Sequence, residues 1–373
     1  MLSIIFLLCL VWTGFVLDEE FSVSRGDFPV RLAAAIILGC FWSTWAVFLL
    51  ALAFGFHAGT VVGGVGLMLA FNLSAWIFRR RNFAWFVSLG TFDRRFWQAS
   101  FFPTLLITGY FAICVWVNRD GDILFRGNTQ DLAYHMGTVS AFMEQSAFPP
   151  LNPQSAAAKL SYHFMADFFS AILCQGGFSL FYSFKIPMVL FAFALCALTC
   201  HFLYSVLKSR AGTVFASLLF FFGHIGIINL AFAVAGYPAG SVPFSLRSWE
   251  KIQDQITYPY YNFLNVIIDF FQPQLPFLFG FPLAMLVLTA LYRRYGQNAL
   301  TDRRLYFLLG LVAFLPLFHI HTFLMLAPLV GLVVLFERTP PSRTPAWDGL
   351  AARLVRLTVE DDPLEAVAPA GDE

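Results

Sequence analysis

The sequence predicts an all-α membrane protein, a polytopic helix bundle with about nine spans. Of its 373 residues, 59% are hydrophobic and only 12% are charged, whereas roughly a quarter of the residues in ordinary soluble domains are charged. Apolar runs of about 17 to 25 residues, the length that crosses the hydrocarbon core as a helix, recur along the chain. A membrane β-barrel would instead show alternating segments of about ten residues.

The first apolar run, residues 2–17, is predicted to be a transmembrane helix. It lacks the basic start and the small-residue cleavage site of a signal peptide, and it leads directly into Asp18, Glu19 and Glu20. The further spans are predicted at 32–55, 58–78, 99–117, 184–207, 211–233, 275–292, 305–318 and 322–336. The last two come from one apolar block, 305–336, which Pro316 and the sequence HIH at 319–321 interrupt. One helix of that length would measure about 48 Å, longer than the core is thick.

Orientation follows from the basic residues, which fall on one side of the predicted spans. That side is expected to be cytoplasmic. The scheme requires that residues 160–180 do not cross the membrane, so they are predicted to form an amphipathic helix on the outer surface. Two long segments, 118–183 and 234–274, then face outward. The basic residues concerned are Arg79, Arg80, Arg81, Arg94, Arg95, Lys208, Arg210, Arg293, Arg294, Arg303, Arg304, Arg338 and Arg343.

Other features of the composition exclude some classes of site. A net charge of +1 gives no excess of basic residues for binding nucleic acid. The six cysteines lie in apolar stretches without metal-ligand spacing, which favours a packing role. The tail, 337–373, is rich in proline and acidic residues and is expected to be disordered on the cytoplasmic side.

The first outer segment concentrates polar residues at two places. A helix that begins near Asp131 brings Tyr134 and His135 to the same face. The prolines of FPPLNP then end this helix. A second surface helix is expected to bring four more polar residues to the same membrane surface: Lys159, Tyr162, His163 and Asp167.

The same side of the membrane is expected to hold further polar groups. His319 and His321 lie at the turn of the last predicted hairpin, and Arg247 and Lys251 lie in the second outer segment. Carboxylate, imidazole and cationic groups at one face of a lipid-embedded bundle indicate chemistry on an amphiphilic substrate. Residues Asp131, His135, His163 and the HIH turn could also form a zinc site, although no close-spaced ligand motif is present.

Three sequence features resemble the C-superfamily of integral membrane glycosyltransferases, which includes protein mannosyltransferases, oligosaccharyltransferase catalytic subunits and aminoarabinose transferases. They are QDLAYH in the first outer segment, the proline- and tyrosine-containing FPPLNP and LSYHF, and GGFSLFYSFK before the next span. The resemblance covers roughly residues 99–235. The family usually places its Asp loop after the first span, so residues 1–98 are expected to be an N-terminal addition of three spans to a module at 99–336.

The resemblance implies transfer of a sugar from a polyprenyl-phosphate donor to a glycan, lipid or protein acceptor at the outer face of the plasma membrane. Asp131 would deprotonate or orient the acceptor, or hold a divalent cation. Contacts to the phosphate would come from His135, His163, Arg247 and Lys251. Tyr134, Tyr162, His319 and His321 complete the candidate substrate site.

Two other classes of function remain open from the sequence. One is a multi-span transporter or lipid flippase, although such proteins tend to carry ionisable or glycine- and proline-broken spans near the midplane. The predicted spans here carry almost no ionisable groups, which favours chemistry at the surface. The other is a non-catalytic assembly subunit.

Overall fold

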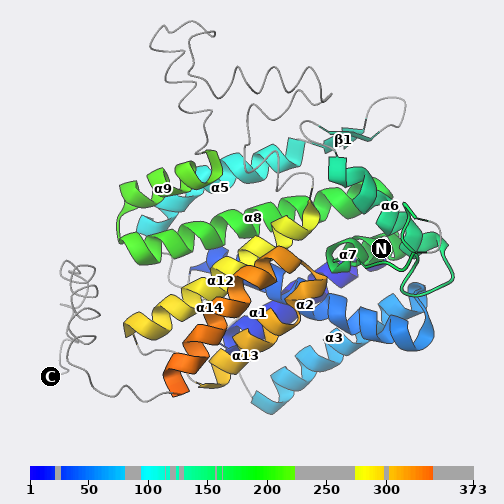
Figure 1. Cartoon of the computed structure of the whole chain (residues 1–373), viewed down its shortest axis with the longest axis horizontal. Helices are drawn as coiled ribbons and strands as arrows, with labels where there is room; N and C mark the ends of the chain where they lie inside the picture. The colour runs from blue at the N-terminus through cyan, green and yellow to red at the C-terminus, as the bar shows by residue number, and fades with distance from the viewer. Residues whose placement is uncertain are drawn as a thin grey trace, which may run out of the picture.

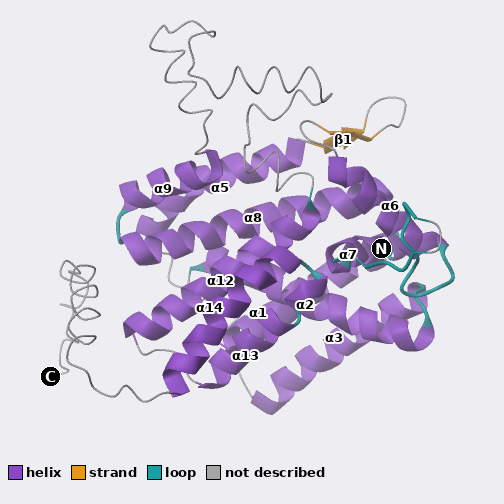
Figure 2. Ribbon diagram, in the orientation of Figure 1, coloured by secondary structure: helices purple, strands orange, loops and turns teal. Residues whose placement is uncertain are grey.

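The computed structural model describes residues 1–21, 27–79, 94–113, 115–117, 123–125, 130–155, 158–161, 163–222, 274–297 and 302–338. This part of the chain is a bundle of helices with one small two-stranded hairpin (Figures 1 and 2). The helices are α1 (Leu2–Phe21), α2 (Phe28–Phe54), α3 (Ala58–Arg79), α5 (Arg94–Ile113), α6 (Gln130–Glu144), α7 (Met165–Gln175), α8 (Leu180–Leu207), α9 (Arg210–Phe222), α12 (Leu275–Gln297), α13 (Asp302–Ala313) and α14 (Ile320–Arg338).

Five of the described helices are long and apolar enough to cross a membrane: α1, α2, α3, α8 and α12. The helical membrane character predicted from the sequence is therefore confirmed, whereas a total of nine spans remains a prediction. Each of the other predicted spans coincides at least in part with a described helix, namely α5, α9, α13 and α14.

The predicted span at 99–117 is wrong at its C-terminal end. Helix α5 ends at Ile113, and Val115–Val117 forms strand β1, which pairs antiparallel with β2 (Ile123–Phe125). The all-α character predicted from the sequence holds for the rest of the described chain, in which this hairpin is a small addition. The β-branched and aromatic residues of the sequences VWV and ILF suit a strand.

The break predicted between the last two spans is present. Helix α13 ends at Ala313, a short 3₁₀ helix covers Leu315–Leu317, and α14 begins at Ile320. Pro316 lies in the 3₁₀ helix, since it cannot donate the hydrogen bond that a continuing α-helix would need. His319 is left in the link between the two helices.

Helices α1 and α2 pack unusually closely because glycines line their crossing. A Cβ atom added at Gly14 would lie 1.8 Å from the carbonyl oxygen of Ala35, and one added at Gly39 would lie 2.1 Å from that of Leu10. Small residues at such positions let two membrane helices approach until their backbones touch.

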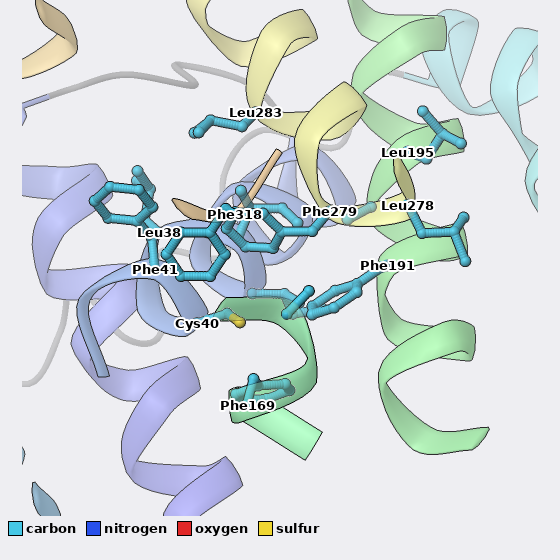
Figure 3. Packing of buried hydrophobic residues seen from close by; sticks show 14 of the residues in the cluster. Leu38, Cys40, Phe41, Phe169, Phe191, Leu195, Leu278, Phe279, Leu283 and Phe318 are labelled. Carbon is cyan, nitrogen blue, oxygen red and sulfur yellow. The ribbon is translucent and has the colours of Figure 1, made fainter. Parts of the chain in front are cut away.

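Phenylalanine rings from α2, α8, α12 and the link before α14 form the centre of the bundle (Figure 3). The ring of Phe318 stacks on Phe279 with centroids 4.4 Å apart and on Phe41 at 5.1 Å. Phe191 of α8 meets Phe279 edge-on at 5.5 Å. Because Phe41 belongs to α2, the described helices within residues 1–98 share one hydrophobic core with the helices that follow them.

The surface helix predicted at 160–180 is wrong. Helix α7 begins only at Met165, and every residue from Met165 to Leu173 is buried. Its phenylalanines, leucine and isoleucine are buried, and so are its polar residues Asp167 and Ser170, so no face of the helix from Met165 to Leu173 is left at a surface. With eleven residues, α7 is too short to cross the membrane.

A second group of phenylalanines holds α7 in place. Phe168 packs against Phe56 and Phe142 at 5.0 Å each and against Phe148 at 5.5 Å. These rings come from the link between α2 and α3, from α6 and from the proline-rich loop. The loop itself is closed by a bridge between Leu151 and Lys159.

The two ends of the bundle differ in chemistry. Figure 1 shows α6, α7 and the N-terminus at one end, called here the α7 end, and the connection from α8 to α9 at the other. At that opposite end, Arg210 donates a 2.6 Å hydrogen bond to Gln98. Arg31 lies 3.6 Å from Asp18 and 3.2 Å from Glu19. The helix ends at this opposite end also carry basic residues that the sequence predicts to be cytoplasmic. They are Arg79 of α3, Arg94 of α5, Arg210 of α9 and Arg338 of α14.

Candidate functional site

Four histidines from three separate parts of the sequence gather at the α7 end. His135 lies on α6, His163 precedes α7, and His319 and His321 lie at the start of α14. The fold places His163 beside His319 and His321 because the N-terminal ends of α7 and α14 meet the first turn of α12. The ring of Phe277, on that turn, is 4.0 Å from the ring of His319 and 5.8 Å from that of His321.

His135 is paired with Asp167. Its Nδ1 lies 2.9 Å from each carboxylate oxygen, and neither side chain has any exposed surface. The pair joins α6 to α7 across 32 residues of sequence. With the Nδ1–H donating to both oxygens, the carboxylate fixes the orientation and the tautomer of the imidazole.

The other three histidines form a cluster, called here the histidine trio (His163, His319 and His321). The ring centroids of His163 and His319 are 5.4 Å apart, those of His319 and His321 are 5.4 Å apart, and those of His163 and His321 are 6.2 Å apart. His163 and His319 are buried, whereas His321 is exposed. The trio therefore extends from the interior of the bundle to its surface.

The ring of His319 is held by its neighbours on two sides. Its Nδ1 forms a hydrogen bond with the hydroxyl group of Thr322, one turn further along α14. Gly280 of α12 lies against both groups, since a Cβ atom there would be 2.7 Å from His319 Nδ1 and 2.7 Å from Thr322 Oγ1. The Nε2 atom of His319 is buried and has no hydrogen-bond partner among the described residues.

The buried position of these groups changes their pKa values. The pKa of His163 is lowered to about 3, mainly by burial and to a smaller extent by the nearby His135 and His321. The pKa of His319 is likewise lowered to about 3, mainly by burial and to a smaller extent by His163 and His321. Burial raises the pKa of Asp167, against the opposing effect of His135. Two rings of the trio are therefore neutral near pH 7.

The structure brings together only part of the site predicted from the sequence. His135, His163, His319 and His321 lie at one end, with half-buried Tyr134 on the turn that carries His135. Asp131 lies in the first turn of α6, four residues before His135, but its side chain is outside the described residues. Tyr162, Arg247 and Lys251 also lie outside them.

Asp167 is the site residue whose role the sequence did not predict. It was expected to lie at the membrane surface beside His163, whereas it is buried as the partner of His135. A usable signal was present, because Asp167 is the only charged residue in the otherwise apolar sequence MADFFSAIL. Ionisable residues inside membrane bundles generally have a partner or a function.

As arranged, no group of three or more His, Cys, Asp or Glu side chains within the described ranges is positioned to hold a metal ion. The predicted cation at Asp131 remains a prediction, since that side chain is not described. Comparisons of the chain with protein-family models, curated proteins and solved structures gave no match.

Proposed function

We propose that this protein is a membrane glycosyltransferase that moves a sugar from a polyprenyl-phosphate donor to an acceptor hydroxyl at the outer membrane face. The observation that carries the proposal is the buried pair of His135 and Asp167. It anchors the second turn of α6 to α7, one turn after the backbone position of Asp131. A helix held in this way at the end of a lipid-embedded bundle suits a reaction between a lipid-linked donor and an acceptor at the membrane surface.

In this proposal, Asp131 is the general base. The acceptor oxygen forms a bond to the anomeric carbon of the sugar, and its proton passes to the carboxylate of Asp131. The bond between that carbon and the phosphate oxygen breaks, and the phosphate leaves with the electron pair. His135 is completely buried, so it acts as a positioning residue through α6 and does not contact the acceptor.

The phosphate must be stabilised as its negative charge develops. Neutral His163 and His319 can donate N–H groups but bring no positive charge of their own. Exposed His321 is the member of the trio that a phosphate group at the surface can reach. Arg247 and Lys251 remain the candidates for a full positive charge, because they belong to the second outer segment of the sequence.

The proposal is tested by replacing Asp131 with Asn in membranes that contain the full-length protein. Transfer from a panel of radiolabelled polyprenyl-phosphate sugars is expected to fall by about 10² to 10⁴. Glu144→Gln is the matched control, because Glu144 is an exposed carboxylate at the other end of the same helix. Full transfer by Asp131→Asn would remove the proposed base, and no transfer by the unmodified protein with any donor would remove the proposed reaction.

The proposed orientation places the α7 end outside the cell, because the basic helix ends then lie in the cytoplasm. A single cysteine introduced at Ala158, in the proline-rich loop, tests this placement in a background without the native cysteines. An impermeant thiol reagent should label it in intact cells. Labelling only after the membrane is opened would reverse the orientation.

A second candidate function, proton-coupled transport, draws support from the same buried pair. Carboxylate and imidazole groups within an apolar helix bundle are typical of proton pathways. The two functions differ in a direct measurement on purified protein in sealed vesicles. Proton movement that depends on Asp167 and occurs without any sugar donor would favour transport.

A further inference from the structure

We infer that the histidine trio (His163, His319 and His321) is a site for a divalent transition metal, with Zn²⁺ as its best-suited ion. The inference concerns metal binding alone and stands independently of the proposed sugar transfer. Imidazole nitrogen is a preferred ligand of zinc. Three protein imidazoles leave one tetrahedral position open, as in catalytic zinc sites.

The ring spacings are close to those that a shared metal requires. With metal–nitrogen distances of about 2.0 to 2.1 Å, tetrahedral geometry places the centroids of two ligating rings about 5 Å apart. His319 meets this spacing with both neighbours, at 5.4 Å from His163 and 5.4 Å from His321. The remaining spacing, 6.2 Å between His163 and His321, is longer by about one ångström.

The ring that has to move belongs to the exposed member of the trio. His321 is exposed at the start of α14, whereas His163 and His319 are buried. A rotation of the His321 side chain toward His163 closes the trio without moving the core. This explains why the trio is not arranged as a metal site in the structure while its two buried members already have suitable spacing.

His319 has the surroundings of a metal-ligating histidine. Ligating histidines usually donate their second ring N–H to a fixed acceptor, which selects the tautomer and aims the other nitrogen. The hydroxyl group of Thr322 is such an acceptor for Nδ1. The opposite nitrogen, Nε2, is buried and unpartnered among the described residues. A bound metal would give this buried polar atom the partner that such atoms normally have.

The test uses full-length protein purified in detergent without a histidine tag, stripped with a chelator and supplied with Zn²⁺. We expect one zinc ion per chain by elemental analysis. Co²⁺ as a second probe should give the visible absorption of a tetrahedral site. His321→Ala should weaken binding at least tenfold, and Thr322→Val by about 10- to 100-fold. His57→Ala is the matched control, since His57 is exposed but bonds only within the start of α3.

His321→Ala is the decisive variant, because its side chain is exposed and its loss should leave the melting temperature of the metal-free protein unchanged. Affinity equal to that of the unmodified protein in both His321→Ala and Thr322→Val would overturn the inference. So would less than about a tenth of an equivalent of zinc on the unmodified protein. Because none of these measurements uses a sugar donor, they leave the test of Asp131 independent.

Discussion

The imidazole of His135 donates from Nδ1 to both carboxylate oxygens of Asp167 at 2.9 Å, in a place that has no contact with solvent. Each group satisfies the other, because a buried imidazole N–H or carboxylate without a partner would be costly. The contact also fixes two short helices, α6 and α7, relative to each other. Its removal should therefore affect both the stability and the geometry of the α7 end.

Replacing Asp167 with Ala should destabilise the protein by about 1 to 3 kcal/mol, because the buried N–H of His135 loses its acceptor. Asp167→Asn keeps an oxygen in the same place and should stay within about 1 kcal/mol of the unmodified protein. Thermal unfolding in detergent measures both. Equal melting temperatures for the Ala and Asn variants would show that the hydrogen bond contributes nothing.

Stability should depend on pH through Asp167. Burial raises the pKa of this carboxyl above its ordinary value of 3.8, with His135 opposing the shift. The folded state therefore binds the proton more tightly than the unfolded chain does. The stabilisation that protonation provides is complete below pH 3.8 and is lost as the pH rises through the folded-state pKa.

The measurement is the melting temperature of the unmodified protein relative to Asp167→Asn at a series of pH values from about 3.5 upward. The Asn variant has no carboxyl to titrate here. The unmodified protein should lose stability relative to it as the pH rises. A gain over the same range would mean that the carboxylate is stabilised by its pairing more than it is disfavoured by burial.

Gly280→Ala should displace His319. The added Cβ would lie 2.7 Å from both His319 Nδ1 and Thr322 Oγ1, which leaves no room for their hydrogen bond. Overpacking of this kind typically costs about 1 to 3 kcal/mol. Gly331→Ala, on α14, is the control, since no atom lies within 4 Å of a Cβ there. Zinc binding by the trio should weaken in the first variant and not in the second.

Gly14→Ala should force α1 and α2 apart, because the new Cβ would lie 1.8 Å from the carbonyl oxygen of Ala35. We expect a loss of at least about 1 to 3 kcal/mol, measured by thermal unfolding. Gly66→Ala on α3, where a Cβ meets nothing within 4 Å, should be neutral or slightly stabilising because alanine favours helix. Similar melting temperatures for the two variants would contradict the close crossing.

The helices of the fold could be predicted from the sequence because each depends on a local pattern. The apolar run of α2 and the interruption at Pro316 follow from residue type and chain length alone. The depth of α7 could not be predicted by the same means. Its burial depends on Phe56, Phe142 and Phe148, which are distant in sequence and meet Phe168 only in the folded bundle.

The candidate site likewise has a part that could be predicted from the sequence and a part that depends on the folded structure. The sequence brought attention to His135, His163, His319 and His321 as polar residues at spans and turns. It did not reveal that Asp167 pairs with His135, because the pairing depends on how α6 and α7 cross. Nor could it show that Gly280 of α12 makes room for His319, since close approach between two helices leaves no local pattern in either.

The shortness and the burial of α7 constrain how the chain assembles in the membrane. Eleven residues that include Asp167 cannot insert as an independent span. The long helices α1, α2 and α8 can enter the bilayer singly and associate afterwards. Helix α7 must therefore take its place late, entering from the membrane surface once the surrounding helices have met. The carboxyl of Asp167 pairs with His135 as the helix enters.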